Sequence, residues 1–406
     1  MASSIAASAD VLIAGAGPAG SATAALLARA GWRVVVAERA AFPREKACAD
    51  YLSPGALRVL DRLGILGRID ARAEPLDGIR VTAARGARLE GIFARAGATP
   101  FRAQGLCLPR AVLDAELMAL ARAAGATVLE RTAVEALVHE DGGIGGAVVR
   151  GPDGRSRALT ARVTIGADGL RSLVAKHMGR RMHGRPRRLA FVAHMEGVAG
   201  PAGRAEMFVA DRRYAGVNPL PAGRVNVALV VPAEEAREAR GRAEPFFREA
   251  LGRFPALAER VARAPIVRRV LVTGPFAARS RRVIAHGGAL VGDAADFFDP
   301  FTGDGVCSAL RGAELLAASL SRALAHAGPV RASALASYAA ARRRAFAGKW
   351  VVERLIAGAM AYPALFDAAV GRLERRNLAH RLVAVTGELL PAGAVLNPRF
   401  LARMVL

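Results

Sequence analysis

Cysteine and histidine are scarce in this chain, and neither is spaced as a metal site requires. The three cysteines stand at positions 48, 107 and 307, without a C-x-x-C pair, and their number is odd. This pattern argues against a disulfide scaffold and favours a reducing compartment. The seven histidines form neither H-x-H nor H-E-x-x-H, so the sequence predicts no metal site.

Long apolar runs are also missing. No uninterrupted apolar stretch reaches the length of a membrane span, and the first ten residues, MASSIAASAD, lack the basic region of a secretory signal. We therefore predict a cytoplasmic protein. The C-terminal segment, residues 332–406, is helical in pattern and strongly apolar in places. Packing on the body of the protein is the simpler interpretation of these helices, and peripheral membrane contact is the alternative.

Lysine is nearly absent, although the formal net charge is +23. Lysine occurs only at positions 46, 176 and 349, and the arginines are spread over the whole chain. Their densest run, RRMHGRPRR at 180–188, is short and contains no aromatic residue. This distribution argues against nucleic acid as a partner. A basic surface still suits an acidic partner or an anionic membrane. With 53% hydrophobic and 23% charged residues over 406 positions, the chain is long enough for two or more folded units.

One stretch, from Val11 to Glu38, organises the rest of the chain. Residues 11–14 predict a buried strand, and Gly15, Gly17 and Gly20 follow it as G-x-G-x-x-G. Small and apolar residues at helical spacing come next, and residues 33–37 predict a second strand that ends at the acid. A strand, a glycine loop, a helix and a closing carboxylate in this order form the βαβ fingerprint of dinucleotide binding.

The chemistry of a dinucleotide explains these residue types. Gly15 permits the tight turn, Gly17 lets a pyrophosphate approach the backbone, and Gly20 allows close packing of helix on strand. The helix N-terminus offers N–H groups to phosphate, and Glu38 stands where a ribose diol would donate hydrogen bonds. The alternative is a tight turn without a ligand, and the fingerprint alone does not distinguish FAD from NAD(P).

Two later segments carry related signals. Residues 44–53 predict a loop that leads into a helix with Ser53 as its N-cap, and this loop is either placed beside a redox ring or an ordinary polar connection. Farther on, Pro300, Gly303 and Gly305 precede a long small-residue helix that begins near Val306. A glycine loop before a helix N-terminus favours electron-rich or anionic groups.

Three segments together resemble the superfamily of FAD-dependent monooxygenases that includes p-hydroxybenzoate hydroxylase. GAGPAG with Glu38 matches its first motif, GADGLRS at 166–172 its D-G motif, and GDAADFFDPFTGDG at 292–305 its G-D motif. REKACADYLSP at 44–54 is similar to the K-x-C-G-x-x-L-S motif of geranylgeranyl reductases, with Ala49 in place of glycine. The nearest similarity is therefore to the branch of geranylgeranyl reductases and flavin halogenases.

The resemblance implies roles for the matching positions. Cys48 would lie beside the flavin and is the candidate catalytic residue. Asp168 would lie near the pyrophosphate and a transient NAD(P)H, and Val134 would reach the adenine through its backbone. The positions to which we assign FAD binding are Gly15, Gly17, Ala19, Gly20, Glu38, Arg39, Lys46, Cys48, Ala49, Tyr51, Arg110, Val134, Asp168, Asp293, Pro300, Gly303, Gly305 and Val306.

The implied fold is α/β: a discontinuous, doubly wound Rossmann-type FAD domain with an inserted, mainly antiparallel substrate sheet and C-terminal helices. We assign the FAD domain to residues 1–76, 106–178 and 276–330. The substrate domain takes residues 77–105 and 179–275, and the C-terminal helical region takes residues 331–406.

The sequence favours an NAD(P)H-dependent monooxygenase that hydroxylates a lipophilic aromatic or polyketide-like metabolite. The alternative is a geranylgeranyl reductase-like enzyme that reduces prenyl double bonds. A halogenase is disfavoured because YAGVNP at 214–219 stands where halogenases carry G-W-x-W-x-I-P, and this hexapeptide also lacks the Trp and Phe of the reductase pattern Y-x-W-x-F-P. A non-catalytic flavin-fold binding protein is a further alternative, and the sequence does not determine the oligomeric state.

Overall fold

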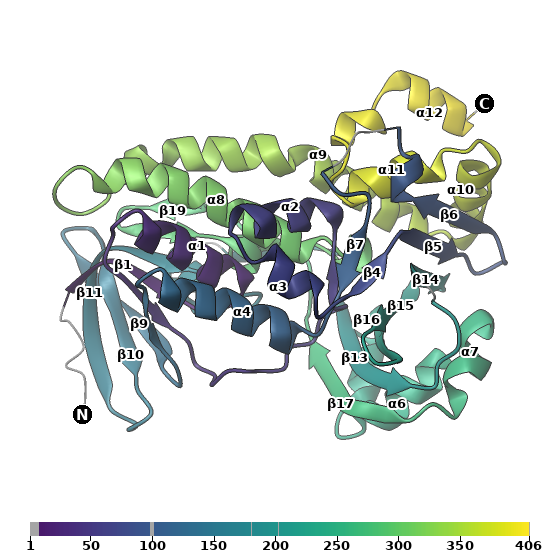
Figure 1. Ribbon diagram of the computed structural model, residues 1–406, viewed down its shortest axis with the longest axis horizontal. Coiled ribbons are helices and arrows are strands. Elements are labelled where there is room, and N and C mark those ends of the chain that lie inside the picture. The colour runs from purple at the N-terminus through teal and green to yellow at the C-terminus, as the bar shows by residue number, and fades with distance from the viewer. Residues whose placement is uncertain (1–7, 98–100, 180, 202, 406) are drawn as a thin grey trace.

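The computed structural model describes residues 8–97, 101–179, 181–201 and 203–405. Residues 1–7, where we predicted no secretory signal, and 98–100, within the predicted strand region before position 101, lie outside these ranges, as does residue 406 of the C-terminal region. The described chain forms two neighbouring halves, each built on a sheet (Figure 1). The predicted α/β class, with an FAD-type fold, antiparallel sheets and C-terminal helices, is confirmed.

The first half contains the nucleotide-type sheet. Its centre is β1, which pairs in parallel with β2 on one side and with β11 on the other. Because β1 is flanked on both edges and covered on both faces, its residues from Val11 to Ala14 are fully buried, as the continuous apolar run requires. The strands, in sheet order, are β19 (Ile284–Ala285), β20 (Gly288–Leu290), β11 (Ser156–Gly166), β1 (Ser8–Ala14), β2 (Val34–Ala37) and β8 (Thr127–Leu129), with β10 (Gly143–Arg150) and β9 (Ala133–Glu140) joined to β11.

Helices cover one face of this sheet. α1 (Pro18–Arg29), α4 (Arg110–Ala123) and α8 (Gly305–Leu324) share one hydrophobic core with β1 and β2 (Figure 1). The β9–β10 hairpin and α5 (Leu173–His177) contribute to the core on the opposite face. The G-x-G-x-x-G turn therefore lies at the carboxyl end of a central strand, where open α/β sheets bind their ligands.

The second half is built on a seven-stranded sheet whose two faces alternate along each strand. On β13, Phe191 and Ala193 pack toward α6 (Ala243–Leu251) and α7 (Pro255–Ala262), whereas Ala190 and Val192 face the C-terminal helices. The strands, in order, are β17 (Ile266–Thr273), β13 (Arg188–Glu196), β16 (Arg224–Pro232), β15 (Arg213–Leu220), β14 (Arg204–Ala210), β5 (Gly78–Thr82) and β6 (Arg88–Ile92). The C-terminal helices are α9 (Ala336–Met360), α10 (Pro363–Arg375), α11 (Ala379–Thr386) and α12 (Pro398–Val405).

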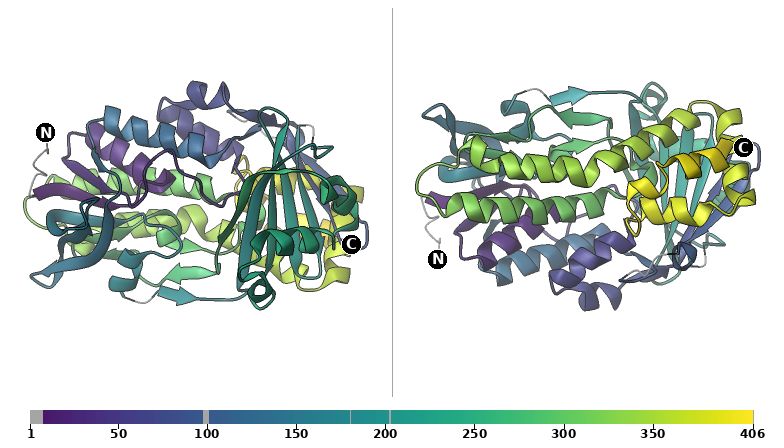
Figure 2. Two further views of the ribbon diagram at one scale, coloured as in Figure 1. Left: turned by 90° about the horizontal axis from the view of Figure 1, so that it is seen from below. Right: turned by 90° about the horizontal axis from the view of Figure 1, so that it is seen from above.

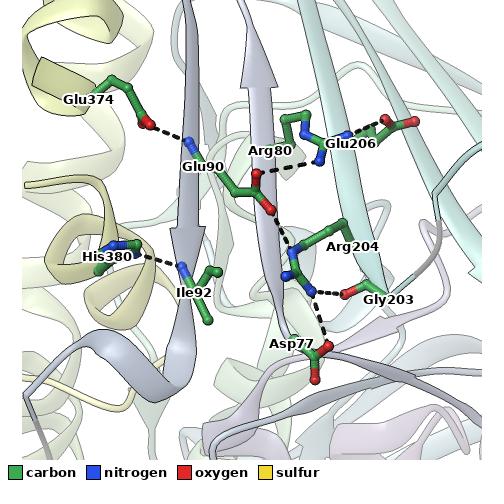
Figure 3. A network of polar contacts seen from close by, with 9 residues as sticks. All are labelled: Asp77, Arg80, Glu90, Ile92, Gly203, Arg204, Glu206, Glu374 and His380. Carbon is green, nitrogen blue, oxygen red and sulfur yellow. Dashed lines mark hydrogen bonds and ion pairs between the residues drawn. The ribbon is translucent and has the colours of Figure 1, made fainter. Parts of the chain in front are cut away.

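The C-terminal helices also close the edge of this sheet at β6. The backbone N–H of Ile92 donates to Nδ1 of His380 at 2.9 Å, and that of Glu90 donates to the carboxylate of Glu374 at 2.9 Å (Figure 3). An edge strand otherwise presents free N–H groups that attract other strands. Beside this edge, Arg204 joins the carboxylates of Glu90 and Asp77.

The remaining elements connect the two halves. Ser53 caps the helix that begins at Pro54, because its side chain accepts a hydrogen bond from the backbone N–H of Ala56, as predicted. Within the described ranges, no helix is long and apolar enough to cross a membrane. The smaller sheets and helices are β3 (Tyr51–Leu52), β7 (Gly105–Cys107), β4 (Glu74–Leu76), β12 (Arg181–His183), β18 (Ala278–Ser280), β21 (Asp296–Phe297), α2 (Pro54–Arg62) and α3 (Leu66–Asp70).

Candidate functional site

A continuous cavity of about 1090 Å³ runs between the two halves, from the glycine loop after β1 to the C-terminal helices. Of the positions to which the sequence analysis assigned FAD binding, all except Gly20 line this cavity. The fold therefore brings together residues that are far apart in the sequence. They come from segments near positions 15, 48, 110, 134, 168, 293 and 303. Lining a cavity is a matter of geometry, and contact of each residue with FAD stays a prediction.

Two glycines of the first loop leave no room for side chains. Gly15 has a φ of +97°, and a Cβ there would lie 2.7 Å from the carbonyl oxygen of Ala167. A Cβ on Gly20 would lie 1.9 Å from the carbonyl oxygen of Gly15, which explains why Gly20 packs behind the loop instead of lining the cavity. No side chain caps the N-terminus of α1, so its first N–H groups are available to a phosphate.

Glu38 is held against this loop. One carboxylate oxygen accepts from the N–H of Ala16 at 2.8 Å and the other from the N–H of Ala40 at 2.9 Å. The side chain is almost completely buried, yet it lines the cavity at the end of β2. This is the position that a ribose diol would reach in a βαβ dinucleotide site.

Basic side chains line the cavity beside the glycine loop. Arg110 forms a bidentate ion pair with Asp114, with both N–O distances at 2.8 Å, and Arg44 approaches the same carboxylate at 3.3 Å. The Nζ atom of Lys46 lies 3.9 Å from a carboxylate oxygen of Asp293, and desolvation lowers the pKa of Lys46. A narrow apolar-walled cleft lined by cations suits a pyrophosphate.

The D-G and G-D motifs meet next to this cleft. Asp168 accepts from the backbone N–H of Leu173 at 2.7 Å, so it caps α5, and burial raises its pKa. Arg181 donates to the carbonyl oxygens of Leu170 and Asp293, and thereby ties the two motifs together. No motif in the sequence had identified Arg181.

The glycine loop of the G-D motif, at Gly303 and Gly305, faces the same cavity. Gly303 has a φ of +68°, and a Cβ there would lie 2.7 Å from Cδ1 of Tyr51. The loop passes directly into α8, which begins at Gly305 without a side-chain cap, so its N-terminal N–H groups face the site. Such a helix N-terminus stabilises negative charge, as a reduced flavin would carry.

A buried ion pair lies behind this loop. Nζ of Lys349 lies 2.5 Å from the carboxylate of Asp304, which also accepts a hydrogen bond from Ser53. Burial raises the pKa of Asp304 to about 7. Glu353 lies 3.6 Å from the same ammonium group. Asp304 also lies near Cys307 and Glu388, but these acids already face Lys349 and Arg311, which disfavours a metal ion there.

The Cys48 loop is held by polar residues that the sequence analysis missed. Neighbouring strands β17, β13, β16 and β15 place Arg268, His194, Asn226 and Asn218 side by side, and we call these four residues the polar row. The side-chain amide of Asn226 donates to the carbonyl oxygen of Cys48 at 2.7 Å, and that of Asn218 donates to the carbonyl oxygen of Ala49 at 2.8 Å. The period of two along each strand directs these residues to the cavity face, but no local motif marks them.

Asp50 connects the loop to the polar row. It has a φ of +56°, which is unusual for a residue with a side chain. Its carboxylate offsets this cost by accepting from the N–H of Arg110 at 3.0 Å and from Asn226 at 2.7 Å, and by pairing with His194 at 2.7 Å. The backbone of the loop is therefore fixed by hydrogen bonds, and the half-buried Cys48 lines the cavity.

The other half of the cavity is apolar. The hydroxyl of Tyr214, which lines this half, donates to Asp299 at 2.7 Å, and Asp299 also pairs with Arg188 at 2.8 Å. Aliphatic and aromatic side chains form the rest of the wall, among them Ile79, Val81, Val192, Val230, Val352, Ile356, Phe366, Val370, Leu373, Leu382, Leu396 and Phe400. This wall suits a ligand that needs burial without hydrogen bonds.

The residues present fit FAD. Gly17 lines the cavity without a side chain, which leaves space for a pyrophosphate, and two uncapped helix N-termini face one cavity that continues into the apolar half. When bound, FAD would be held by the glycine loop and Glu38 at one end and by the Gly303–Val306 segment at the other.

Comparison with known proteins agrees with this geometry. The profile of the FAD binding domain matches residues 8–353. Over 314 residues the chain is 32% identical to digeranylgeranylglycerophospholipid reductase 1 of Methanopyrus kandleri, which covers 74% of this chain and 77% of that protein. A menaquinone reductase of Mycolicibacterium smegmatis is 39% identical over 175 residues, 43% of this chain and 41% of that protein. The match therefore spans about two fifths of the length of the menaquinone reductases.

Among solved structures, PqsL of P. aeruginosa, determined in complex with 2-aminobenzoylacetate, superposes with a TM-score of 0.73 at 26% identity. The superposition covers 89% of this chain and 98% of PqsL. The chain is thus similar to reductases in sequence and to PqsL in fold. The chain belongs to the family of this FAD binding domain, and it is an enzyme of the FAD-dependent oxidoreductases.

Proposed function

We propose that the protein is an FAD-dependent reductase that saturates a carbon–carbon double bond in the prenyl chain of a lipophilic compound. The observation that carries this proposal is the continuity of the apolar cavity with the nucleotide cleft. A long hydrocarbon chain could lie along this wall with one double bond beside the redox ring. The hydroxyl of Tyr214, which lines this half, already donates to Asp299, so a substrate without hydrogen-bonding groups does not leave it unsatisfied.

The similar reductases support this choice of substrate class. One is named for digeranylgeranylglycerophospholipid and the other for menaquinone. The Lys46–Ser53 segment, which resembles the reductase motif, lies at the junction of the two parts of the cavity. Asn218 stands where the reductase pattern has Phe, and its side-chain amide donates a hydrogen bond to the carbonyl oxygen of Ala49 in this segment. The residue that departs from the pattern therefore supports the loop.

Saturation of a double bond requires a hydride on one carbon and a proton on the other. FAD, when bound and reduced, would supply the hydride, and we propose NAD(P)H as the donor that reduces it. Cys48 lines the cavity at the junction, and we assign its thiol as the source of the proton, which water then restores. The polar row keeps the Cys48 backbone in place, and the apolar wall excludes water from the hydride.

A second candidate is the NAD(P)H-dependent monooxygenase that the sequence analysis favoured. The superposition on PqsL over nearly its whole length supports it. In this reaction a lipophilic aromatic or polyketide-like compound would gain one oxygen atom from O₂, and the second atom would leave as water. The two proposals differ in their need for oxygen.

The deciding experiment is anaerobic turnover. The FAD-loaded protein is supplied with NADPH or NADH and with a menaquinone whose prenyl chain is unsaturated, and the product is examined by mass spectrometry. A gain of two hydrogen atoms without oxygen, lost in Cys48→Ala at unchanged FAD content, is the expected result. A product that forms only in air and contains an added oxygen atom would overturn the reductase proposal in favour of the monooxygenase.

A further inference from the structure

The cavity opens to the surface between two C-terminal helices. Leu355 on α9 and Leu401 on α12 both line the cavity, yet their exposed fractions are 56% and 46%. A side chain that is both exposed and part of the wall marks the mouth of a cavity. The mouth is therefore framed by leucine side chains and leads directly to the apolar wall.

Further exposed apolar side chains lie on α9 and α10. Val351 precedes Leu355 by one helical turn, and Tyr362 and Leu365 follow where α9 passes into α10. We call Val351, Leu355, Tyr362, Leu365 and Leu401 the entrance patch. Figure 2 shows these helices gathered on one side of the molecule. Scattered exposed hydrophobics need no explanation, but a group on the C-terminal helices, two of whose members line an apolar cavity, does.

Arginines accompany the entrance patch. Arg344 and Arg354 on α9 and Arg399 on α12 are exposed, and none of them takes part in an ion pair with another described residue. The guanidinium group offers a planar fork of donors that matches a phosphate, and it is weakly hydrated. The guanidinium group of Arg354 lies over the ring of Phe298, and none of the three cations is neutralised by an acid within the described ranges. Apolar side chains beside such cations complement a surface of acyl chains and phosphate headgroups.

We propose that the entrance patch docks on an anionic lipid bilayer and that the lipophilic substrate enters the cavity from the membrane between α9 and α12. The substrate class rests on the proposed function, whereas the docking surface rests on the patch itself. A protein partner on this patch would cover the mouth. A fluid bilayer leaves it open and holds an apolar substrate that would not cross water.

The test is flotation of the FAD-loaded full chain with lipid vesicles. Vesicles of equal parts phosphatidylcholine and phosphatidylglycerol should carry the protein, and vesicles of phosphatidylcholine alone should carry much less, with the difference reduced in high salt. The double variant Leu355→Glu/Leu401→Glu should bind the anionic vesicles at least about tenfold more weakly, because two apolar contacts are lost. Val267→Glu is the matched control, because Val267 is 46% exposed but lies on β17, away from these helices.

Two outcomes would overturn the proposal. Either the parent protein stays unbound with anionic vesicles, or the double variant floats as well as Val267→Glu. Light scattering adds a third: if the parent is a dimer and the double variant a monomer of normal FAD content, a second copy occupies the patch instead. The assay contains no turnover, so a protein that binds vesicles without reducing prenyl chains refutes the proposed function alone.

Discussion

The two ends of the cavity are built in opposite ways. At the nucleotide end, backbone N–H groups and glycines form much of the wall, together with charged side chains such as Arg110, and Gly15, Gly17 and Glu38 come from one short stretch of chain. At the apolar end, side chains form the wall, and they come from strands and helices spread over more than three hundred residues. A cofactor shared by many enzymes is recognised through the backbone, whereas the substrate that distinguishes one enzyme is recognised through side chains. The following predictions test that contrast, from the largest expected effect to the smallest.

The nucleotide end should tolerate no added atoms. In Gly20→Val the new side chain would start 1.9 Å from the carbonyl oxygen of Gly15, so the loop must move. We expect FAD affinity to fall by more than about 100-fold, which corresponds to roughly 3 kcal/mol. The FAD content of the purified protein, measured from flavin absorbance, checks this. Gly67→Ala, where nothing lies within 4 Å of the added atom, should keep its FAD.

Between the two ends, the positive charge of Lys349 lies beside the buried carboxylates of Asp304 and Glu353. In Lys349→Met the charge of Asp304 loses its partner, and we expect unfolding to become easier by about 3 kcal/mol. Burial raises the pKa of Asp304 to about 7 and raises that of Glu353, so the native state retains protons that the unfolded chain has lost. Stability contributed by these acids therefore falls as pH rises from about 4 to about 7. Urea unfolding should show a larger deficit for the variant at about pH 8 than at about pH 5, and equal deficits would contradict this account.

The Cys48 loop tests whether the substrate sheet supports the cofactor end. Asn226→Ala removes the hydrogen bonds to the carbonyl of Cys48 and to Asp50, and should cost about 1–3 kcal/mol of stability. The thiol of Cys48 should then react faster with a thiol reagent, and the other two cysteines are buried. An unchanged reaction rate at lowered stability would make Asn226 a purely structural residue.

The apolar end should accept changes that alter only the choice of substrate. Ala369→Phe places a ring in the cavity wall on α10. We expect the FAD content to stay the same, while kcat/KM for long prenyl chains falls by about tenfold relative to short ones, equivalent to about 1.4 kcal/mol. Steady-state kinetics with two chain lengths measures this. If FAD is lost as well, the two ends are not separable.

The same contrast explains what could be predicted from the sequence. The βαβ turn, the N-cap at Ser53 and the glycine loop before α8 depend on neighbouring residues, and the structure contains each as predicted. The fold class followed from the order of the three motifs. Long-range features leave no such local signal. Asn218, His194 and Arg268 meet the Cys48 loop only because four strands pair in one register, and a single sequence does not encode that register locally.

The residues that line the apolar half of the cavity could not be predicted, for a related reason. Val192, Val352 and Phe366 are ordinary core residues by pattern, and only a cavity in front of them makes them a binding wall. Likewise, Leu355 looks like one more apolar position of a helix until its exposure and its place at the mouth are known together.

The central position of β1 has a consequence for synthesis of the chain. The ribosome delivers this strand long before its partner, because Val11 pairs with Val163, and β20 and the loop at Gly303 come later still. Until residue 306 or so has emerged, the glycine loop lacks the partners that complete the cavity. The nascent chain must therefore keep an apolar strand edge protected until β11 has emerged, and FAD can join only after the Gly303 loop. The cofactor then fastens together segments that are made far apart in time, so chains folded without FAD should be less stable than chains folded with it.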